Sequence, residues 1–463
     1  MLKALKRFAV RLPKIWRLNN EINSLKYDKC LNANNQSVGL VDVFDLHPVA
    51  VSRNLNILNC LDANGIRPVV FQRTWGFSKI SNPKVSVLWL IYEQLLTYFL
   101  YRRYENLKVN YLKRDKKLES SIYLNDLLLD GIMRYEGIAD INDIEEAVFE
   151  KHARCAVSIY KSIENFFAEQ QCSICITGHK TYYLRGILYR LSGLNGKGLY
   201  IGPRFNSFIT KRLTPSNYND CYDYIRSETD FFQVEKKELR IEGWLEDIRQ
   251  SQVNERFISP FKQKIPLLAF HCWVDDNFKG RFNIFESHFS AAVEMSKWLA
   301  KNNIPFLYKL HPHNDNYGVS HYDVRFKEFV TKSSIKCLDV SGIQLSALVD
   351  SISLIVTGNG SIGPESKELE IPFLCYADAP YYVEKEWAYT SRKEVLFEKL
   401  KGHQMALSSA TRDNQDTYYN LEFENDVDPC FLAAHDADYF DYGKVDYAAR
   451  WAGSVLNWYF NGK

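Results

Sequence analysis

The sequence predicts an α/β protein with two Rossmann-type domains that face a central cleft. At 463 residues the chain is too long for one ordinary domain. In each half, short apolar runs of strand length alternate with segments of helical periodicity, which is the pattern of parallel βαβ units. Polar and titratable side chains follow several of these strands. Because the carboxyl ends of parallel strands share one edge of a sheet, we expect a ligand site at that edge.

The first half opens with a strand at 38–44 that leads into a helix. Gly65, just past that helix, is typical of a helix C-terminus. The further elements predicted in this half are helix 51–64, strand 68–71, a long helical region at about 84–168, strand 173–177, helix 183–194 and strand 199–201. We assign residues 31–260 to an N-terminal Rossmann-like domain and treat 84–168 as a helical insertion.

The second half restarts the same alternation after a polar stretch. Strands are predicted at 266–270, 306–310, 335–338, 353–357 and 371–376, with helices at 289–302, 324–331 and 343–350 and a further helix that opens at Pro364. Alternation of this kind indicates a second parallel sheet. We assign residues 261–435 to a C-terminal Rossmann-like domain and residues 436–463 to a C-terminal helix.

A glycine-rich loop follows the strand at 353–357. It runs from Gly358 to Gly363, and the next helix opens at Pro364, whose fixed φ suits a first turn. Backbone N–H groups in such a loop bind anions, so a nucleotide phosphate is the expected ligand. The residues that we expect to bind the nucleotide in this loop and helix are Asn359, Gly360, Ser361 and Glu365, the last through a ribose hydroxyl.

A second motif, Lys309-Leu-His-Pro-His313, begins in the strand at 306–310 and continues past its end. A histidine just beyond a buried strand can donate to a phosphate through one ring nitrogen while the protein holds the other. Pro312 stiffens the loop. We expect Lys309, His311 and His313 to bind the same nucleotide as the glycine-rich loop.

Four residues at strand ends are candidates for the catalytic step: Asp275, Asp276, His271 and His47. A carboxylate can take a proton from an acceptor hydroxyl or act as a nucleophile. Asp45 is a further candidate for the base. A pair of aspartates can also suggest Mg²⁺, but no third carboxylate is near in sequence, and we predict no metal.

Three stretches carry a family resemblance: Phe306-Leu-Tyr-Lys-Leu-His-Pro312, Thr357-Gly-Asn-Gly-Ser-Ile-Gly-Pro-Glu365, and Ile371-Pro-Phe-Leu-Cys375 with Tyr381. They resemble the His-Pro and Ser motifs of the bacterial capsular-polysaccharide glycosyltransferases. These enzymes have the GT-B fold and include Kdo transferases and other CMP-activated nonulosonate transferases.

The resemblance implies a glycosyltransferase of capsule or O-antigen synthesis. It would transfer Kdo or another nonulosonate from a CMP donor in the C-terminal domain to a glycan acceptor, on a lipid carrier, in the N-terminal domain. His311 and Ser361 would bind the donor phosphate. No cofactor besides the nucleotide sugar is implied, because fixed hydrogen-bond donors can stabilise an anionic leaving group without a metal.

Other interpretations of the same residues stay open. The donor can be a UDP- or GDP-hexose, or the enzyme can transfer a polyol phosphate from CDP-glycerol. The pattern Gly358-x-Gly360-x-x-Gly363, with Asp378 after the next strand, also matches the dinucleotide fingerprint of an NAD(P)-dependent oxidoreductase. A non-enzymatic assembly protein that retains the fold is a fourth interpretation.

Composition and charge indicate in which compartment the protein works and which classes of partner it does not bind. The net charge of +2 does not indicate nucleic acid. The ten cysteines are expected to be reduced thiols in a reducing compartment. Cys172 and Cys175 form one C-x-x-C in an apolar strand, where positions three apart should face opposite sides and share no metal. We expect a cytoplasmic protein without a signal peptide.

The first residues predict a contact with the inner membrane. Residues 1–17 carry six basic side chains and no acidic one, and their apolar side chains fall on one helical face. This is the pattern of an amphipathic helix on an anionic membrane, and a docked or solvated terminal helix fits it equally well. We treat 1–30 as a separate basic segment. The apolar run at 85–100 is interrupted by Glu93 and is expected to be a buried or interfacial helix.

Overall fold

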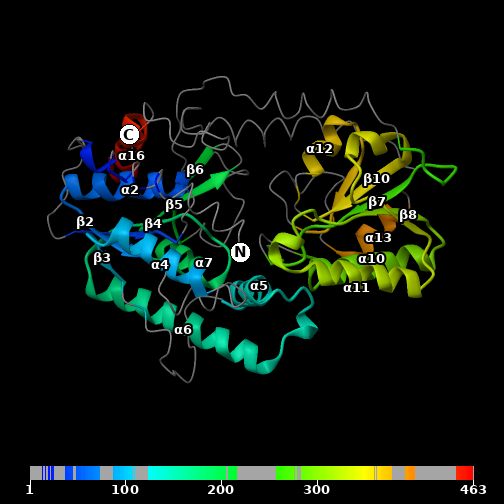
Figure 1. The fold of residues 1–463 in the computed structure, drawn as a ribbon, viewed down its shortest axis with the longest axis horizontal. Helices are drawn as coiled ribbons and strands as arrows, with labels where there is room; N and C mark the ends of the chain where they lie inside the picture. The colour runs from blue at the N-terminus through cyan, green and yellow to red at the C-terminus, as the bar shows by residue number, and fades with distance from the viewer. Residues whose placement is uncertain are drawn as a thin grey trace.

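The protein is represented by a computed structural model. It describes residues 37–44, 48–72, 87–107, 109, 124–204, 207–215, 257–275, 277–278, 283–358, 360, 362–377, 390, 392–401 and 445–461, with positions 13, 16, 19–20 and 22–25. These residues form two halves, each built on its own sheet, which lie side by side in Figure 1.

The N-terminal sheet has the strand order β3-β2-β1-β4-β5-β6. Its strands are β1 (Val38–Asp42), β2 (Arg67–Phe71), β3 (Glu105–Asn106), β4 (Cys172–Thr177), β5 (Gly198–Arg204) and β6 (Ser207–Leu213). All neighbours are parallel except β5 and β6. The strand order reverses between β1 and β4, and ligands of doubly wound sheets bind at such a switch point.

Helices cover both faces of this sheet. One face carries α2 (Pro48–Ala63), α4 (Val87–Tyr101) and α16 (Val445–Asn461), whose apolar side chains share a core with Val41 and Ile174. The other face carries α5 (Asn125–Glu136), α6 (Glu146–Glu169) and α7 (Tyr183–Leu194), which pack with Leu40 and Cys175. The predicted helical region at 84–168 therefore supplies covering helices and the edge strand β3.

The C-terminal helix α16 lies against the N-terminal half. Ala452, Val455 and Leu456 are fully buried in the core that contains α2, and α16 is drawn in red beside α2 in Figure 1. Arg212 Nη2, on the edge strand β6, donates to the carbonyl oxygen of Tyr459 at 2.7 Å. The chain thus crosses to the second half and returns to the first.

The C-terminal sheet is parallel throughout, with the order β11-β10-β7-β8-β9. Its strands are β7 (Ile265–Ala269), β8 (Phe306–Lys309), β9 (Cys337–Asp339), β10 (Ile352–Thr357) and β11 (Phe373–Cys375). Its helices are α10 (His288–Lys301), α11 (Ser320–Lys332), α12 (Ile362–Glu368) and α13 (Lys393–Lys401), with 3-10 turns η3 (Asp315–Tyr317) and η4 (Leu345–Ser351). Here the switch point lies between β7 and β10.

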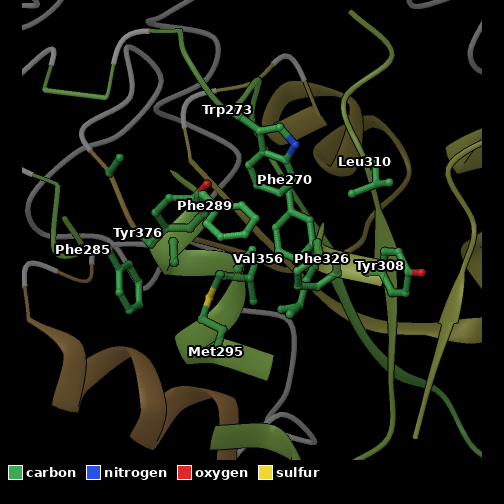
Figure 2. Packing of buried hydrophobic residues seen from close by; sticks show 14 of the residues in the cluster. Phe270, Trp273, Phe285, Phe289, Met295, Tyr308, Leu310, Phe326, Val356 and Tyr376 are labelled. Carbon is green, nitrogen blue, oxygen red and sulfur yellow. The ribbon is translucent and has the colours of Figure 1, made fainter. Parts of the chain in front are cut away.

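An aromatic core fixes α10 and α11 on one face of this sheet. Phe270 and Phe326 meet edge to face with ring centroids 5.0 Å apart, and Trp273 is fully buried beside them (Figure 2). The indole Nε1 of Trp273 donates to Asp323 Oδ1 at 2.6 Å, so its one polar atom is satisfied. Trp273 follows β7, and this packing fixes the loop that carries the candidate residues His271 and Asp275.

The predicted fold class is confirmed. Both halves are α/β units with a Rossmann order of parallel strands, to which the N-terminal half adds the antiparallel edge strand β6. Helix α7 begins and ends where the sequence predicts. The predicted helix at 343–350 is instead the 3-10 turn η4, and α12 spans only seven residues.

One sequence prediction about the cysteines is wrong. Regular alternation along a strand puts Cys172 and Cys175 on opposite faces, but both lie in the same buried cluster. The register between β1 and β4 shifts between Val38 and Gly39, and such an irregularity re-aims side chains. Among the described residues no group of three metal-ligating side chains occurs, and burial raises the pKa of Cys172 to about 11.

No helix in the described ranges is long and apolar enough to cross a membrane.

Candidate functional site

The candidate site of the C-terminal half lies at its switch point. His271 follows β7, His311 follows β8, and Gly358 and Gly360 follow β10. The rings of His271 and His311 meet edge to face, with centroids 5.6 Å apart. A Cβ atom added to Gly360 would lie 3.7 Å from His271 Nδ1. The His-Pro motif and the glycine-rich loop therefore meet at one place, and His271 lies between them.

His311 is a neutral hydrogen-bond donor. The backbone N–H of His313 donates to His311 Nδ1 at 3.2 Å, so the ring proton resides on Nε2. Burial, together with nearby His313, lowers the pKa of His311 to about 4, although Asp275 opposes the shift. At neutral pH this imidazole is uncharged and presents one oriented N–H.

A histidine–tyrosine network joins loops of the site, with His288 and Tyr376 fully buried and His271 half-buried. His288 Nε2 lies 3.1 Å from the backbone carbonyl of Asp275, so it donates there. His288 Nδ1 then accepts from the Tyr376 hydroxyl at 3.1 Å. A backbone hydrogen bond from His271 also reaches that hydroxyl, and burial raises the pKa of Tyr376. The loop after β7, the start of α10 and the loop after β11 are thereby held to one another.

Glycine is required where the loop after β10 crosses this network. A Cβ atom on Gly358 would lie 3.1 Å from the Tyr376 hydroxyl oxygen and 3.2 Å from His288 Cε1. Both neighbours are fully buried and cannot move away easily. The backbone of Gly358 is therefore seated directly on the network.

Asp275 receives one hydrogen bond and one ion pair from the N-terminal half. The Tyr182 hydroxyl donates to Asp275 Oδ1, and Arg134 Nη1 lies 3.4 Å from the same oxygen. The Arg134 guanidinium lies over the ring of Tyr317 at 3.5 Å, which fixes its plane. The Asp275 side chain is 30% exposed, so one carboxylate is shared by the two halves and still reaches solvent.

Tyr182 comes from the switch point of the N-terminal sheet. It lies directly after the β4 loop and before α7, with a positive φ of 61° that few non-glycine residues adopt. Its ring stacks on His179 with centroids 5.4 Å apart. The switch points of the two sheets are therefore in contact through Tyr182 and Asp275.

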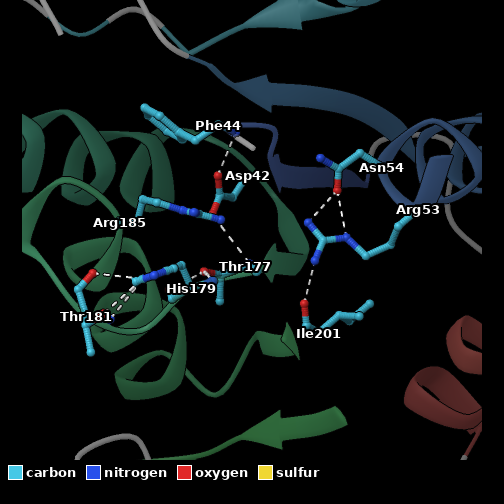
Figure 3. A network of polar contacts seen from close by, with 10 residues as sticks. Asp42, Phe44, Arg53, Asn54, Thr177, His179, Thr181, Arg185 and Ile201 are labelled. Carbon is cyan, nitrogen blue, oxygen red and sulfur yellow. Dashed lines mark hydrogen bonds and ion pairs between the residues drawn. The ribbon is translucent and has the colours of Figure 1, made fainter. Parts of the chain in front are cut away.

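A network of buried polar groups closes the N-terminal switch point (Figure 3). Asp42, at the end of β1, is fully buried and accepts from the N–H groups of Phe44 at 3.0 Å and Gly178 at 3.4 Å. Arg185 Nε donates to its second oxygen at 2.9 Å. All of these bonds join elements of the same half, so this carboxylate serves the fold.

Arg53 completes that network from α2. Its Nη1 donates to the Ile201 carbonyl at 2.6 Å, and Nε donates to Asn54 Oδ1 at 2.9 Å. A Cβ atom on Gly178 would lie 2.7 Å from the guanidinium nitrogens. The guanidinium therefore fixes the loop after β4, which leads to Tyr182.

In the structure some of the predicted site residues lie together, while others bond to groups outside the cluster. His271, His311, Gly360 and Asp275 form one cluster at the C-terminal switch point. Lys309 donates through Nζ to the carbonyls of Ser341, at 3.3 Å, and Ile343, so its ammonium is tied to the loop after β9. Burial lowers the pKa of Lys309, and Glu365 opposes this shift, so that carboxylate lies near the ammonium.

His313 is exposed, and its Nδ1 is 2.8 Å from Asn316 Nδ2. Its backbone N–H sets the tautomer of His311. The remaining predicted site residues lie outside the described part of the chain: Asp276, His47, Asn359 and Ser361, together with Asp45.

Sequence reasoning did not identify four residues that shape the site: Arg134, Tyr182, His288 and Tyr376. Arg134 and Tyr182 act on Asp275 from the other half of the chain. His288 opens α10, and Tyr376 follows β11, so both could have been found as polar residues at element ends. No pattern in the sequence indicates that they meet.

The comparisons with known proteins give weak likenesses. No protein-family model matches the chain, and no curated protein matches it. It is similar to the UDP-GlcNAc 2-epimerase of Methanocaldococcus jannaschii at 10% identity, over 83% of this chain and 98% of that one, with a TM-score of 0.28.

Two further solved structures have comparable scores. A glycosyltransferase from Rickettsia africae matches at 10% identity, over 91% of this chain and 99% of that one, with a TM-score of 0.28. The wall teichoic acid polymerase TagF matches at 14% identity, over 99% and 98% of the two chains, with a TM-score of 0.24. TM-scores this low carry no argument about this protein, so the fold is assigned from the sheet topology alone.

Proposed function

We propose that this protein is a glycosyltransferase that moves a sugar from a nucleotide donor to a glycan acceptor in bacterial surface-polysaccharide synthesis. One observation carries the proposal. His271, His311 and the glycine-rich loop converge at the switch point of the C-terminal sheet, and Asp275 lies beside them with partners from the opposite half. Nucleotide ligands of doubly wound sheets bind at such points.

The donor phosphate is held by groups that carry no net charge of their own. His311 presents its Nε2–H, and the glycine-rich loop, whose backbone N–H groups would contact the phosphate, passes His271 at Gly360. Such donors are fixed before reaction, so they stabilise negative charge that develops on the leaving phosphate without reorganising. The network of His271, His288 and Tyr376 holds the loops around these donors in place.

Asp275 acts as the base in this mechanism. An acceptor hydroxyl attacks the anomeric carbon of the donor sugar, and its proton passes to the Asp275 carboxylate. The bond between that carbon and the donor phosphate oxygen breaks, and the phosphate leaves with the electron pair toward His311. Tyr182 and Arg134 hold the carboxylate in place from the acceptor half.

The donor that we propose is CMP-linked Kdo or another CMP-nonulosonate, with a lipid-linked glycan as acceptor and no cofactor. The support is the motif resemblance at 306–312 and 357–365. A thermal-shift screen against CMP, CDP, UDP and GDP tests the nucleotide, because a ligand at a hundred times its Kd raises stability by about 2.7 kcal/mol. Stabilisation by UDP or GDP alone would replace the CMP donor with a hexose donor.

Turnover of two variants tests the enzyme class. His311→Ala and Ser361→Ala should each lower donor turnover by about tenfold or more, since each removes a donor to the leaving phosphate. His321→Ala is the matched control, because His321 is exposed on α11. Wild-type turnover in both phosphate-site variants would remove the assignment.

Transfer of a polyol phosphate from CDP-glycerol is the nearest rival, because the same donors would stabilise its leaving phosphate. The mass of the product separates the two reactions, since the rival adds a phosphodiester and the proposed reaction adds a sugar. An oxidoreductase is less favoured by the geometry. The loop at Gly358 follows β10, the fourth strand of its half, and leads into the seven-residue α12. A fluorescence titration with reduced nicotinamide tests this alternative.

A further inference from the structure

Helix α4 belongs to the N-terminal half (Figure 1) and carries an exposed apolar stripe. We use the name α4 stripe for Ile91, Leu95 and Tyr98, which are 41%, 62% and 63% exposed. Their spacing of four and then three residues puts them on one face of the helix. Arg102, exposed, continues the same line four residues later.

The opposite face of α4 is firmly packed. Leu96, Leu100 and Tyr101 are buried in the core shared with α2 and α16. Glu93, the one acidic residue of α4, is only 7% exposed. The helix is therefore docked in a fixed orientation, with its carboxylate turned inward and its apolar stripe turned outward.

Basic side chains follow the stripe at the end of α4, and the sequence carries more of them before Ile22. Arg102 and Arg103 are both exposed at the end of α4. The chain before Ile22 carries the six basic residues of 1–17, and Ile22 is buried in the core that holds Leu96. Asn59 Nδ2 donates to the Ile22 carbonyl at 3.3 Å. Ile22, five residues after that segment, therefore packs beside α2 in the core that α4 shares, and Trp16 is 54% exposed.

We propose that the α4 stripe is a docking surface for a lipid bilayer with anionic headgroups. Leucine and isoleucine side chains enter the acyl boundary, a tyrosine lies at the headgroup level, and arginines pair with lipid phosphates. A second copy of the chain fits less well, because a stable interface needs about 800 Å² from each partner. Three apolar side chains with two exposed arginines at the end of the same helix match a membrane surface better.

The test is co-sedimentation of the full chain with vesicles, without nucleotide or acceptor, so its outcome is independent of the proposed enzyme activity. Vesicles of phosphatidylcholine are compared with vesicles in which about a third of the lipid is phosphatidylglycerol. Wild type should bind the anionic vesicles more tightly. The double variant Ile91→Gln with Leu95→Gln should bind them about tenfold more weakly, because less apolar surface is buried.

Val324→Gln is the matched control, since Val324 is 56% exposed on α11 in the other half, and it should bind as wild type does. Tyr98→Gln alone provides a milder variant if the double variant melts early. Arg102→Gln should weaken binding to the anionic vesicles only.

Three results would overturn the proposal. If the wild-type protein binds neither kind of vesicle, the α4 stripe is not a membrane-binding surface. Equal binding by wild type and the folded stripe variants would place the contact elsewhere. Light scattering in the absence of lipid that finds a wild-type dimer and a monomeric double variant would identify the stripe as a contact between two copies.

Discussion

The two sheets have the same central strand order, yet their switch points use different chemistry. In the N-terminal half, Asp42 is fully buried and bonded to two backbone N–H groups and Arg185. In the C-terminal half, His311 keeps a neutral ring and a proton on Nε2, next to a glycine-rich loop. In the N-terminal half, groups of the fold itself pair with the buried Asp42 carboxylate. In the C-terminal half, we propose that His311 and the glycine-rich loop offer hydrogen-bond donors to an anion.

The difference follows from the cost of burying charge. A buried carboxylate must be paired and hydrogen-bonded, and Asp42 obtains both from its own half. A neutral imidazole can be half-buried at lower cost, because protonation is what burial opposes. The switch point of a doubly wound sheet can thus hold an internal ion pair, as in the N-terminal half, or present donors for a phosphate, as we propose for the C-terminal half.

Removal of the base should have the largest effect. Asp275→Asn keeps the shape of the side chain but cannot take a proton, so kcat should fall by roughly 10²–10⁴ while the donor KM changes little. Steady-state kinetics with the best donor measures this. Asp315→Asn, at an exposed position on η3, is the control. A loss of less than about fivefold for Asp275→Asn would assign the base to another residue.

Two glycine variants compare the switch points directly. Gly178→Ala forces a methyl group against Arg53 in the N-terminal half and should destabilise the protein by about 1–3 kcal/mol, through overpacking. Gly358→Ala presses on His288 and Tyr376 and should weaken nucleotide binding in addition to lowering stability.

Denaturant unfolding and nucleotide titration of both variants separate the two effects. If Gly178→Ala weakens nucleotide binding as strongly as Gly358→Ala does, the N-terminal switch point also serves the nucleotide and the two points do not have separate roles.

The pH dependence of stability should report on His311. Its pKa in the folded protein is about 4, below the ordinary 6.5, so the unfolded chain binds the proton more readily. Stability from the neutral ring is therefore present above pH 6.5 and is lost as pH falls toward 4. Relative to wild type, His311→Asn should lose less stability over that window. Parallel thermal melts of the two proteins across it would contradict the buried, neutral histidine.

Loss of the Tyr182 hydroxyl should have the smallest effect. Tyr182→Phe removes one hydrogen bond to a carboxylate, and such bonds contribute about 1.5–3 kcal/mol at most. Because Arg134 still reaches Asp275, we expect kcat to fall by a factor of several and the donor KM to stay unchanged. Tyr160→Phe, which loses a similar bond to Glu164 on α6, should be silent. Equal kinetics for the two variants would remove Tyr182 from the site.

The sequence was a good guide to local structure. Hydrophobic periodicity located β1, β7 and β10, and it gave both ends of α7, because these elements bury regular apolar faces. It also singled out His311 and the loop at Gly360, since polar residues after buried strands are few. Strand-end position alone was enough to predict that these two lie near one another.

Long-range geometry could not be predicted in the same way. Nothing local to Lys309 indicates that its ammonium turns to the carbonyls of Ser341 and Ile343. The contact of Tyr182 with Asp275 joins residues from two separately predicted halves. The shared face of Cys172 and Cys175 depends on a register shift that no alternation of residue types records.

The proposed phosphate site depends on His311 acting as a neutral donor at the C-terminal switch point. Nitrogen NMR of ¹⁵N-labelled histidine rings observes this proton itself, with His311→Asn to assign the signal and the buried His152 of the N-terminal half as internal reference. We predict a neutral ring with the proton on Nε2 at neutral pH, and a shift of that nitrogen alone when CMP is added. A charged ring, a proton on Nδ1, or no response to any of CMP, CDP, UDP and GDP would rule out His311 as the phosphate donor.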